Sequence, residues 1–193
     1  MQKLPTQYYL QDDVTALASS LIGKVLATRI KGEEVTSGFI TETEAYEGVT
    51  DRASHAHGGR HTPRTATMFM QGGIAYIYLC YGIHHLFNVV TNREGIPHAV
   101  LIRGIQPLEG IDVMASRTAK SPRELKKING PGKISKALGI TTRLDRTPLN
   151  GSTIWISNNG LVVPEDKIKR TPRIGVDYAG GHARWPYRFY WMA

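Results

Sequence analysis

Three short apolar runs in the middle of the chain limit the possible folds more than any other feature. Residues 74–81 (IAYIYLCY), 85–90 (HLFNVV) and 98–104 (HAVLIRG) are rich in β-branched and aromatic residues, which favour strands. Gly82 and the segment 92–97 separate these runs as turns. Because parallel strands need a crossover of a dozen or more residues between them, we expect an antiparallel meander.

The first quarter of the chain predicts a helix followed by a hairpin. In residues 10–22 the apolar side chains recur at helical spacing, with Asp12 or Asp13 as an N-cap and Gly23 just past the end. Residues 24–31 resemble a strand, 32–34 a turn, and 35–46 the returning strand.

The second half of the chain predicts a mixture of helices and strands. We expect helices at 107–116, with Pro107 at the start, and at 122–128. Residues 129–140 read as a Gly/Pro turn and a short helix, and 152–157 and 160–163 as strands. The composition shows no linker-like change. We therefore expect one α+β domain, residues 1–193, with a curved, mostly antiparallel β-sheet, flanking helices and a protruding β-hairpin.

The composition is typical of a globular protein. Of the 193 residues, 41% are hydrophobic, which is enough for a substantial core. No apolar run approaches 18 residues and no N-terminal stretch resembles a signal peptide, so we expect a soluble cytoplasmic protein without a membrane span. The single cysteine, Cys80, excludes an intrachain disulfide; its apolar neighbours predict a buried structural thiol.

The charge balance favours an anionic partner. The 24 Lys and Arg residues outnumber the 16 Asp and Glu, for a formal net charge of +8. Such an excess attracts polyanions through long-range steering and counterion release. By itself it does not distinguish DNA, RNA or anionic lipid.

The segment FITETEAYEG, residues 39–48, places acidic groups on one face of a predicted strand. Side chains alternate along a strand, so Glu42, Glu44 and Tyr46 share a face. Glu44 could act as a general base on water, kept ionised by Arg103 of the neighbouring run. Alternatively, these charges form a solvated ion-pair ladder at the strand end. The pattern alone leaves both interpretations open.

Residues 48–67 form a long loop without periodicity, which in a compact domain is usually functional or disordered. Its His55, His57 and His61 could join nearby carboxylates as metal ligands. Their spacing matches no known zinc pattern, and three arginines of the loop would repel a dication. We therefore expect no metal here. The three arginines are Arg52, Arg60 and Arg64.

Tyrosines in the meander could stack on nucleic-acid bases. For Tyr76, within the apolar strand, a place in the core is the better interpretation. Tyr81 stands beside Gly82 at the predicted hairpin tip, so we expect it to be exposed. An exposed aromatic tip on a basic protein can insert between stacked bases.

Several ordered blocks of this sequence resemble the alkyladenine (3-methyladenine) DNA glycosylases, and the chain looks like a bacterial-type member. The resemblance extends from about residue 8 to residue 190. The blocks, in order, are ETEAYEG, HAHGGRHTPRT, MFMQGGIAYIYLCYGIHHLFNVV, AVLIRGIQPLEG, NGPGKISKAL, RIGVDYAGG and RFY.

The resemblance implies a monofunctional glycosylase that flips alkylated or deaminated purines out of duplex DNA and hydrolyses the N-glycosidic bond, starting base excision repair. By motif, Glu44 matches the glutamate that activates water, and Arg103 the arginine that helps to position it. Tyr46, His55 and Tyr78 match the aromatic residues that sandwich the flipped base.

The remaining matches concern selectivity and DNA. Asn88 matches the asparagine that excludes the exocyclic amine of guanine, and Tyr81 the tyrosine that intercalates in place of the flipped base. Arg60, Arg64 and Lys133 fall in loops that approach the DNA backbone.

The resemblance also implies the partners and excludes a cofactor. We expect the protein to need neither cofactor nor metal, to work as a monomer on double-stranded DNA containing a damaged purine, and to associate with the bacterial nucleoid. The competing hypotheses are a metallohydrolase that uses the histidine loop, a nucleic-acid binding module without catalysis, and acyl or formyl transfer on a shared fold.

Overall fold

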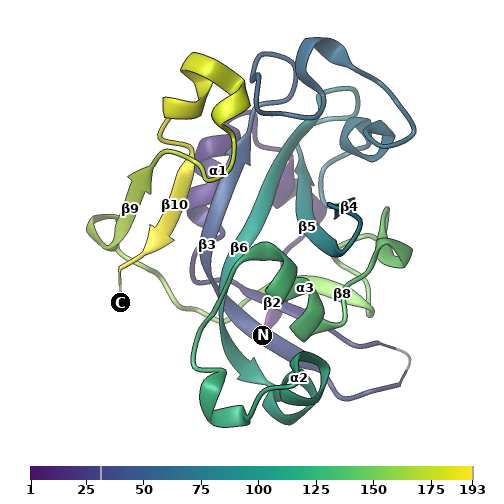
Figure 1. The fold of residues 1–193 in the computed structure, drawn as a ribbon, viewed down its shortest axis with the longest axis vertical. Coiled ribbons are helices and arrows are strands. Elements are labelled where there is room, and N and C mark those ends of the chain that lie inside the picture. The colour runs from purple at the N-terminus through teal and green to yellow at the C-terminus, as the bar shows by residue number, and fades with distance from the viewer. Residues whose placement is uncertain (31, 193) are drawn as a thin grey trace.

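A ten-stranded sheet organises the protein, seen here in a computed structural model that describes residues 1–30 and 32–192 (Figure 1). The main path of the sheet runs β1-β8-β2-β3-β6-β5-β4, and β7, β9 and β10 extend it at the sides. All of the strand pairs described are antiparallel. The strands are β1 (Gln2–Lys3), β2 (Val25–Thr28), β3 (Thr36–Tyr46), β4 (Ala75–Cys80), β5 (His84–Thr91), β6 (His98–Glu109), β7 (Ile128–Asn129), β8 (Ile154–Asn158), β9 (Ile168–Thr171) and β10 (Arg188–Trp191).

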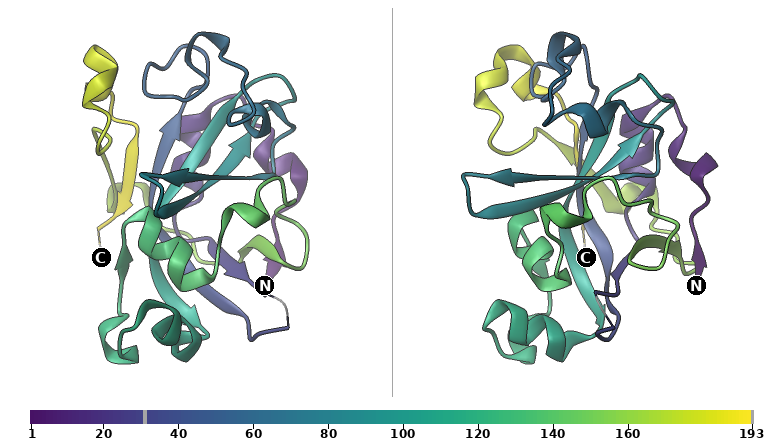
Figure 2. Two further views of the ribbon diagram at one scale, coloured as in Figure 1. Left: turned by 45° about the vertical axis from the view of Figure 1, so that its right-hand side comes forward. Right: turned by 90° about the vertical axis from the view of Figure 1, so that its right-hand side faces the viewer.

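Helices cover both faces of this sheet. The helix α1 (Val14–Ser20) packs on β3 and β6 from one side, and α2 (Ile111–Thr118) and α3 (Pro131–Leu138) lie on the other (Figures 1 and 2). The predicted α+β class with a curved antiparallel sheet is thereby confirmed. The predicted N-cap is also present, because Asp13 accepts hydrogen bonds from the backbone N–H groups of Thr15 and Ala16.

The predicted meander forms as β4, β5 and β6. The β4–β5 hairpin projects away from the sheet as a separate arm (Figure 2). Its tip consists of Tyr81, Gly82 and Ile83, and Tyr81 is 92% exposed. Tyr81 also has a φ of 51°, a left-handed conformation that side chains other than Gly or Asn rarely adopt.

Strand β3 lies at the centre and determines the curvature. It pairs with β6 along its length, with β2 near its start and with β10 near its end. The register with β6 shifts on both sides of Glu42, which marks a bulge. Bulges bend a strand and often occur beside functional sites. Thr43 donates a hydrogen bond to the Ala18 carbonyl on α1, so Glu42 and Glu44 face the opposite side of the sheet.

The β2–β3 hairpin predicted from residues 24–46 is present, and Lys31, at the end of its first predicted strand, lies outside the described residues. The helix predicted at 107–116 begins later than expected. Strand β6 continues through Pro107, which pairs with Gly38, and α2 starts only after Gly110. Gly110 has a φ of 67°, and a Cβ there would clash with the Val35 carbonyl oxygen, so the turn requires glycine.

Two other local predictions are wrong. Within residues 122–128 the only helical segment is one 3-10 turn, Pro122–Glu124. No longer helix forms because Ile128 belongs to strand β7, where it pairs with Ile105 of β6. Residues 160–163 form no strand; Val163 packs instead on the hydrophobic core. The C-terminal segment contains β9, β10 and the helical turn η7 (Asp177–Arg184), none of which was predicted.

Candidate active site

The acidic stretch of β3 is buried. Glu44 is completely inaccessible and Glu42 is 9% exposed, which rules out a solvated ion-pair ladder. As alternation along the strand predicted, both carboxylates and the Tyr46 ring lie on the same side, where Glu42 and Glu44 both contact Arg103.

Glu44 is held by three groups from different parts of the chain. Oε1 lies 3.3 Å from Arg103 Nε and accepts a hydrogen bond of 2.8 Å from the Ile174 backbone N–H. Oε2 accepts a bond of 2.9 Å from the Tyr46 hydroxyl and a longer one, 3.5 Å, from Arg103 Nη1. The Glu44 carboxylate thus accepts three hydrogen bonds, and its contact with Arg103 Nε is an ion pair, because the single hydrogen of that nitrogen is donated to Glu42.

Burial raises the pKa of the Glu44 carboxyl above its usual range. Arg103, the Ile174 N–H and the Tyr46 hydroxyl oppose that effect, because each stabilises the ionised form. The site therefore holds a carboxylate that takes up a proton more readily than an exposed glutamate does. Shifted carboxyl groups of this kind are typical of general bases.

Glu42 orients Arg103 rather than facing the pocket. Its Oε1 lies 3.2 Å from Arg103 Nε and 2.7 Å from Arg188 Nε, on β10. Glu42 thus pairs with arginines of the sheet and not with those of the 52–64 loop. Arg103 is the residue of β6 left without a partner between the Glu42–Gly104 and Thr43–Ile102 pairs, and the two carboxylates hold its guanidinium between them.

A cavity of about 640 Å³ opens above Arg103. Its size is typical of small-molecule and nucleotide sites. Most of the predicted site residues line it, and Glu44 lies just beneath it, bonded to Tyr46, Arg103 and Ile174 of its wall. The predicted residues in the wall are Tyr46, His55, Arg64, Tyr78, Tyr81, Asn88, Arg103 and Lys133.

The aromatic wall of the cavity is fixed by hydrogen bonds. The ring centroids of His55 and Tyr78 are 4.6 Å apart and their planes nearly perpendicular. Arg64 Nη2 lies 3.3 Å from His55 Nε2, and since a guanidinium only donates, that nitrogen accepts. The proton of neutral His55 is then on Nδ1, which lies 2.9 Å from the Tyr76 hydroxyl. Burial lowers the pKa of His55 to about 4, so the ring is neutral at physiological pH.

Tyr76 and Asn88 form the base of this wall. Tyr76 is 2% exposed, in agreement with the predicted core position, and burial raises the pKa of its hydroxyl to about 12. Asn88 is 4% exposed, and its Nδ2 donates to the carbonyls of Tyr76 and Leu86. Both hydrogens of that amide are therefore engaged, which fixes the side chain.

The family model described as methylpurine-DNA glycosylase matches residues 8–193. The chain belongs to this family. A relative from Chlamydia abortus is 47% identical over 188 residues, covering 96% of both chains. One from Desulfitobacterium hafniense is 41% identical over 197 residues, covering 98% of this chain and 95% of the relative. One from Bacillus mycoides is 41% identical over 202 residues, with 99% and 96% covered. Each of the three bears the name "putative 3-methyladenine DNA glycosylase".

In this member of the methylpurine-DNA glycosylase family, a buried ion pair that the sequence did not reveal supports the site. Arg173 donates to Asp51 from both terminal guanidinium nitrogens, Nη1 and Nη2, and both side chains are fully inaccessible. Arg173 also donates to the Ala45 carbonyl, and its guanidinium lies 4.8 Å from the centroid of Tyr46. Since Ile174 is the next residue, this pair anchors both the Tyr46 ring and the N–H that contacts Glu44.

The histidines of the loop do not converge. His57 Nδ1 lies 3.0 Å from the Val49 carbonyl, and the His61 ring packs on Phe69, whereas His55 faces Tyr76. Within residues 1–30 and 32–192, no three His, Cys, Asp or Glu side chains are arranged to hold a metal ion. Cys80 is half-buried at the cavity wall, so the predicted burial of this thiol is wrong.

Of the four predicted DNA-binding residues, three line the cavity and one does not. Tyr81 and Lys133 are exposed at its rim, and Arg64 lies over the Tyr78 ring, 4.9 Å from its centroid. Arg60 is exposed on the loop and does not line the cavity. Tyr178, missed from the sequence, closes another part of the rim and donates to the Ala53 carbonyl.

None of the helices described is both long and apolar enough to cross a membrane.

Proposed function

We propose that this protein is a monofunctional DNA glycosylase that flips an alkylated or deaminated purine out of duplex DNA and hydrolyses its N-glycosidic bond. The observation that carries the proposal is the buried Glu44 carboxylate, held by Arg103 and the Ile174 N–H beneath an aromatic cavity. The family and the names of the relatives support an activity on methylated purines.

Glu44 activates the attacking water in this mechanism. Its four contacts are not equal, and the one from Arg103 Nη1, at 3.5 Å, is the weakest. A water molecule that replaces this contact lies between the carboxylate and the guanidinium. Glu44 then accepts the proton of the water while Arg103 orients its oxygen. The same carboxylate stabilises the positive charge that develops on the sugar.

The flipped base stacks between opposite walls of the cavity. His55 and Tyr78 already contact each other edge to face, so no ring fits between them. The base therefore stacks on this pair from one side, with Tyr46 on the other. Asn88, whose amide is held by two backbone carbonyls, presents a rigid edge against the exocyclic amine of guanine.

Alkylated purines suit this environment better than neutral lesions. They carry a positive charge, which favours both stacking on electron-rich rings and departure of the base. His55 has a pKa of about 4, so it seldom holds a proton to give to a neutral leaving group at pH 7. We therefore expect deaminated purines to be excised more slowly than alkylated ones.

The hairpin tip fills the gap that the flipped nucleotide leaves. Tyr81 is 92% exposed and Ile83 is 70% exposed at the end of the projecting arm. Apolar side chains in such a position insert between base steps and partly unstack them. The enzyme acts as a monomer on bacterial DNA, and needs no metal or cofactor.

The test is base release from duplex oligonucleotides that each carry one lesion. The purified protein should release the free purine from 3-methyladenine and hypoxanthine duplexes, detected by mass spectrometry, and leave abasic sites that alkali cleaves. An undamaged duplex is the control, and activity should persist in EDTA. Binding without base release would instead identify a nucleic-acid binding module, and loss of activity in EDTA a metallohydrolase. Borohydride should trap no covalent adduct, because the reaction is hydrolytic.

A further inference from the structure

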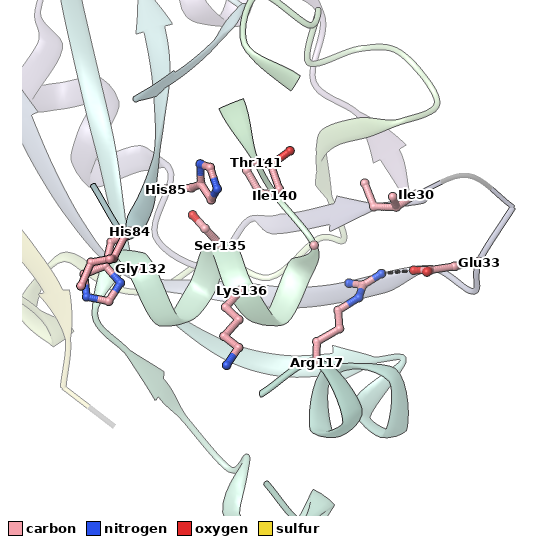
Figure 3. A pocket seen from close by; sticks show the side chains of 12 residues that line it. Ile30, Glu33, His84, His85, Arg117, Gly132, Ser135, Lys136, Ile140 and Thr141 are labelled. Carbon is pink, nitrogen blue, oxygen red and sulfur yellow. Dashed lines mark hydrogen bonds and ion pairs between the residues drawn. The ribbon is translucent and has the colours of Figure 1, made fainter. Parts of the chain in front are cut away.

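A second cavity, of about 450 Å³, is lined by His85 of β5. Leu86 and Asn88 of the same strand line the 640 Å³ cavity above Arg103, called the lesion cavity below, so the two cavities lie on opposite sides of the β4–β5 hairpin. The walls of the second cavity come from the returning strand β5, helix α3 and the turn between β2 and β3 (Figure 3). In Figure 2 the hairpin projects with the 48–67 loop and η7 on one side and α3 on the other. Among the described residues, the two cavities share His84, next to the hairpin tip, and Gly132 of α3.

Ser135 gives this second cavity an unsatisfied hydrogen-bond donor. The residue is 1% exposed, and its hydroxyl finds no partner within the part of the chain that the structure describes. Figure 3 shows the hydroxyl on the side of α3 that faces His85. A buried hydroxyl without a partner is destabilising, and an anionic oxygen that accepts a hydrogen bond from it removes that cost.

His85 supplies a second donor beside it. Its Nδ1 accepts a hydrogen bond of 3.2 Å from the Thr142 backbone N–H. In the neutral ring the proton must then be on Nε2, and in the charged ring Nε2 is protonated as well. This nitrogen is therefore a donor in either state.

The charged side chains that line the cavity are Arg117, Lys136 and Glu33, so its wall carries a small positive excess. Arg117 is neutralised by Glu33 and donates to the Ala137 carbonyl. Lys136 lines the cavity and Lys133 lies one turn earlier on the same helix. Two donors in a cationic setting are suited to an anionic oxygen.

We propose that this second cavity binds a backbone phosphate of DNA on the side of the Tyr81 wedge away from the lesion. The inference rests on the proposed function: if the arm inserts into a duplex, DNA continues along both of its sides. One side delivers the damaged nucleotide to the lesion cavity, and the other passes over His85 and Ser135. A phosphate oxygen at the mouth of the cavity accepts from His85 Nε2. The Ser135 hydroxyl, covered in the free protein, is uncovered as the phosphate enters and donates to the same oxygen.

Ser135→Ala tests the contact with little risk to the fold. Removal of an unsatisfied hydroxyl should leave the melting temperature unchanged or slightly higher. Affinity for a duplex with a tetrahydrofuran abasic site, which has no glycosidic bond to cleave, should fall about tenfold. The rate of base release at saturating protein should not change, because the lesion cavity is intact. Ser157→Ala, at an equally buried position on β8, is the matched control.

A methylphosphonate scan then locates the phosphate. Each backbone phosphate of the abasic duplex is replaced in turn by a neutral methylphosphonate, and binding is measured with the wild type and Ser135→Ala. At one phosphate outside the abasic nucleotide, the methylphosphonate and Ser135→Ala combined should weaken binding no more than either change alone. Additive effects at every position would overturn the proposal, even if the protein excises lesions normally. Absence of base release with non-additive binding would instead contradict the proposed function alone.

Discussion

The buried Asp51–Arg173 pair allows the sharpest prediction of stability. Asp51→Asn keeps the shape of the side chain but removes the charge opposite a guanidinium that is completely inaccessible. Breaking a buried ion pair from one side costs about 3–5 kcal/mol, because the other charge remains buried and uncompensated. For a domain of 150–250 residues, each kcal/mol lowers the melting temperature by about 2–4 °C. The expected decrease is therefore about 6–20 °C.

Thermal denaturation followed by circular dichroism measures this change, and a surface pair provides the control. Glu165 forms an exposed ion pair with Arg170, at 3.3 Å, and its side chain is 87% exposed. Glu165→Gln should cost at most about 1 kcal/mol. A melting temperature for Asp51→Asn within 2 °C of that of Glu165→Gln would refute the argument from burial.

The same pair should also affect excision. Arg173 supports the Tyr46 ring and precedes Ile174, whose N–H contacts Glu44. The double variant Asp51→Leu, Arg173→Met replaces the charges by apolar groups and should regain part of the lost stability. Its excision rate, measured well below its melting temperature, should stay low. Recovery of the wild-type rate would show that the pair supports the fold only.

Two further predictions concern the pH profile and the wedge. Because burial raises the pKa of Glu44, single-turnover excision should increase with pH as the carboxylate ionises and then level off; a rate that falls over this range would exclude Glu44 as the base. Stability should change in the opposite direction: a raised folded-state pKa favours folding below it, and this contribution is lost as the pH rises through it, so Glu44→Gln should reduce the pH dependence of the melting temperature. Tyr81→Ala should weaken lesion binding by about tenfold or more, given about 1–3 kcal/mol per stacked base, with an unchanged melting temperature because Tyr81 is 92% exposed. A clear drop in melting temperature would place Tyr81 in a structural role.

Local sequence patterns predicted the parts of the fold that local physics determines. The meander was evident because its turns are short and its strands rich in Tyr, Ile and Val. The helix after Gly110 was misplaced because pairing with β3 extends β6 through Pro107, and that pairing involves residues about 70 positions away. Likewise, the residues around Ile128 favour a helix, but Ile128 forms a strand because it pairs with Ile105 of β6.

In the candidate site, too, local sequence predicts some contacts, whereas others depend on residues far apart in the chain. Alternation along β3 indicated that Glu42, Glu44 and Tyr46 share a face, and the neighbouring strand supplied Arg103. The contact from the Ile174 N–H could not be predicted, because a backbone group carries no signal in the side-chain sequence. Arg173 lies 122 residues from Asp51, and only the folded chain brings the two together.

A comparison of Glu44→Gln with Glu42→Gln tests the assignment of the catalytic base most directly. The two residues share one strand face and both contact Arg103, but only Glu44 lies beside the Ile174 N–H and the Tyr46 hydroxyl. Single-turnover excision of 3-methyladenine should fall by about 10²- to 10⁴-fold in Glu44→Gln, the usual contribution of a general base, while affinity for the lesion duplex is retained. Glu42→Gln should lose much less activity. Wild-type excision by Glu44→Gln, or an equal loss in both variants, would contradict the assignment.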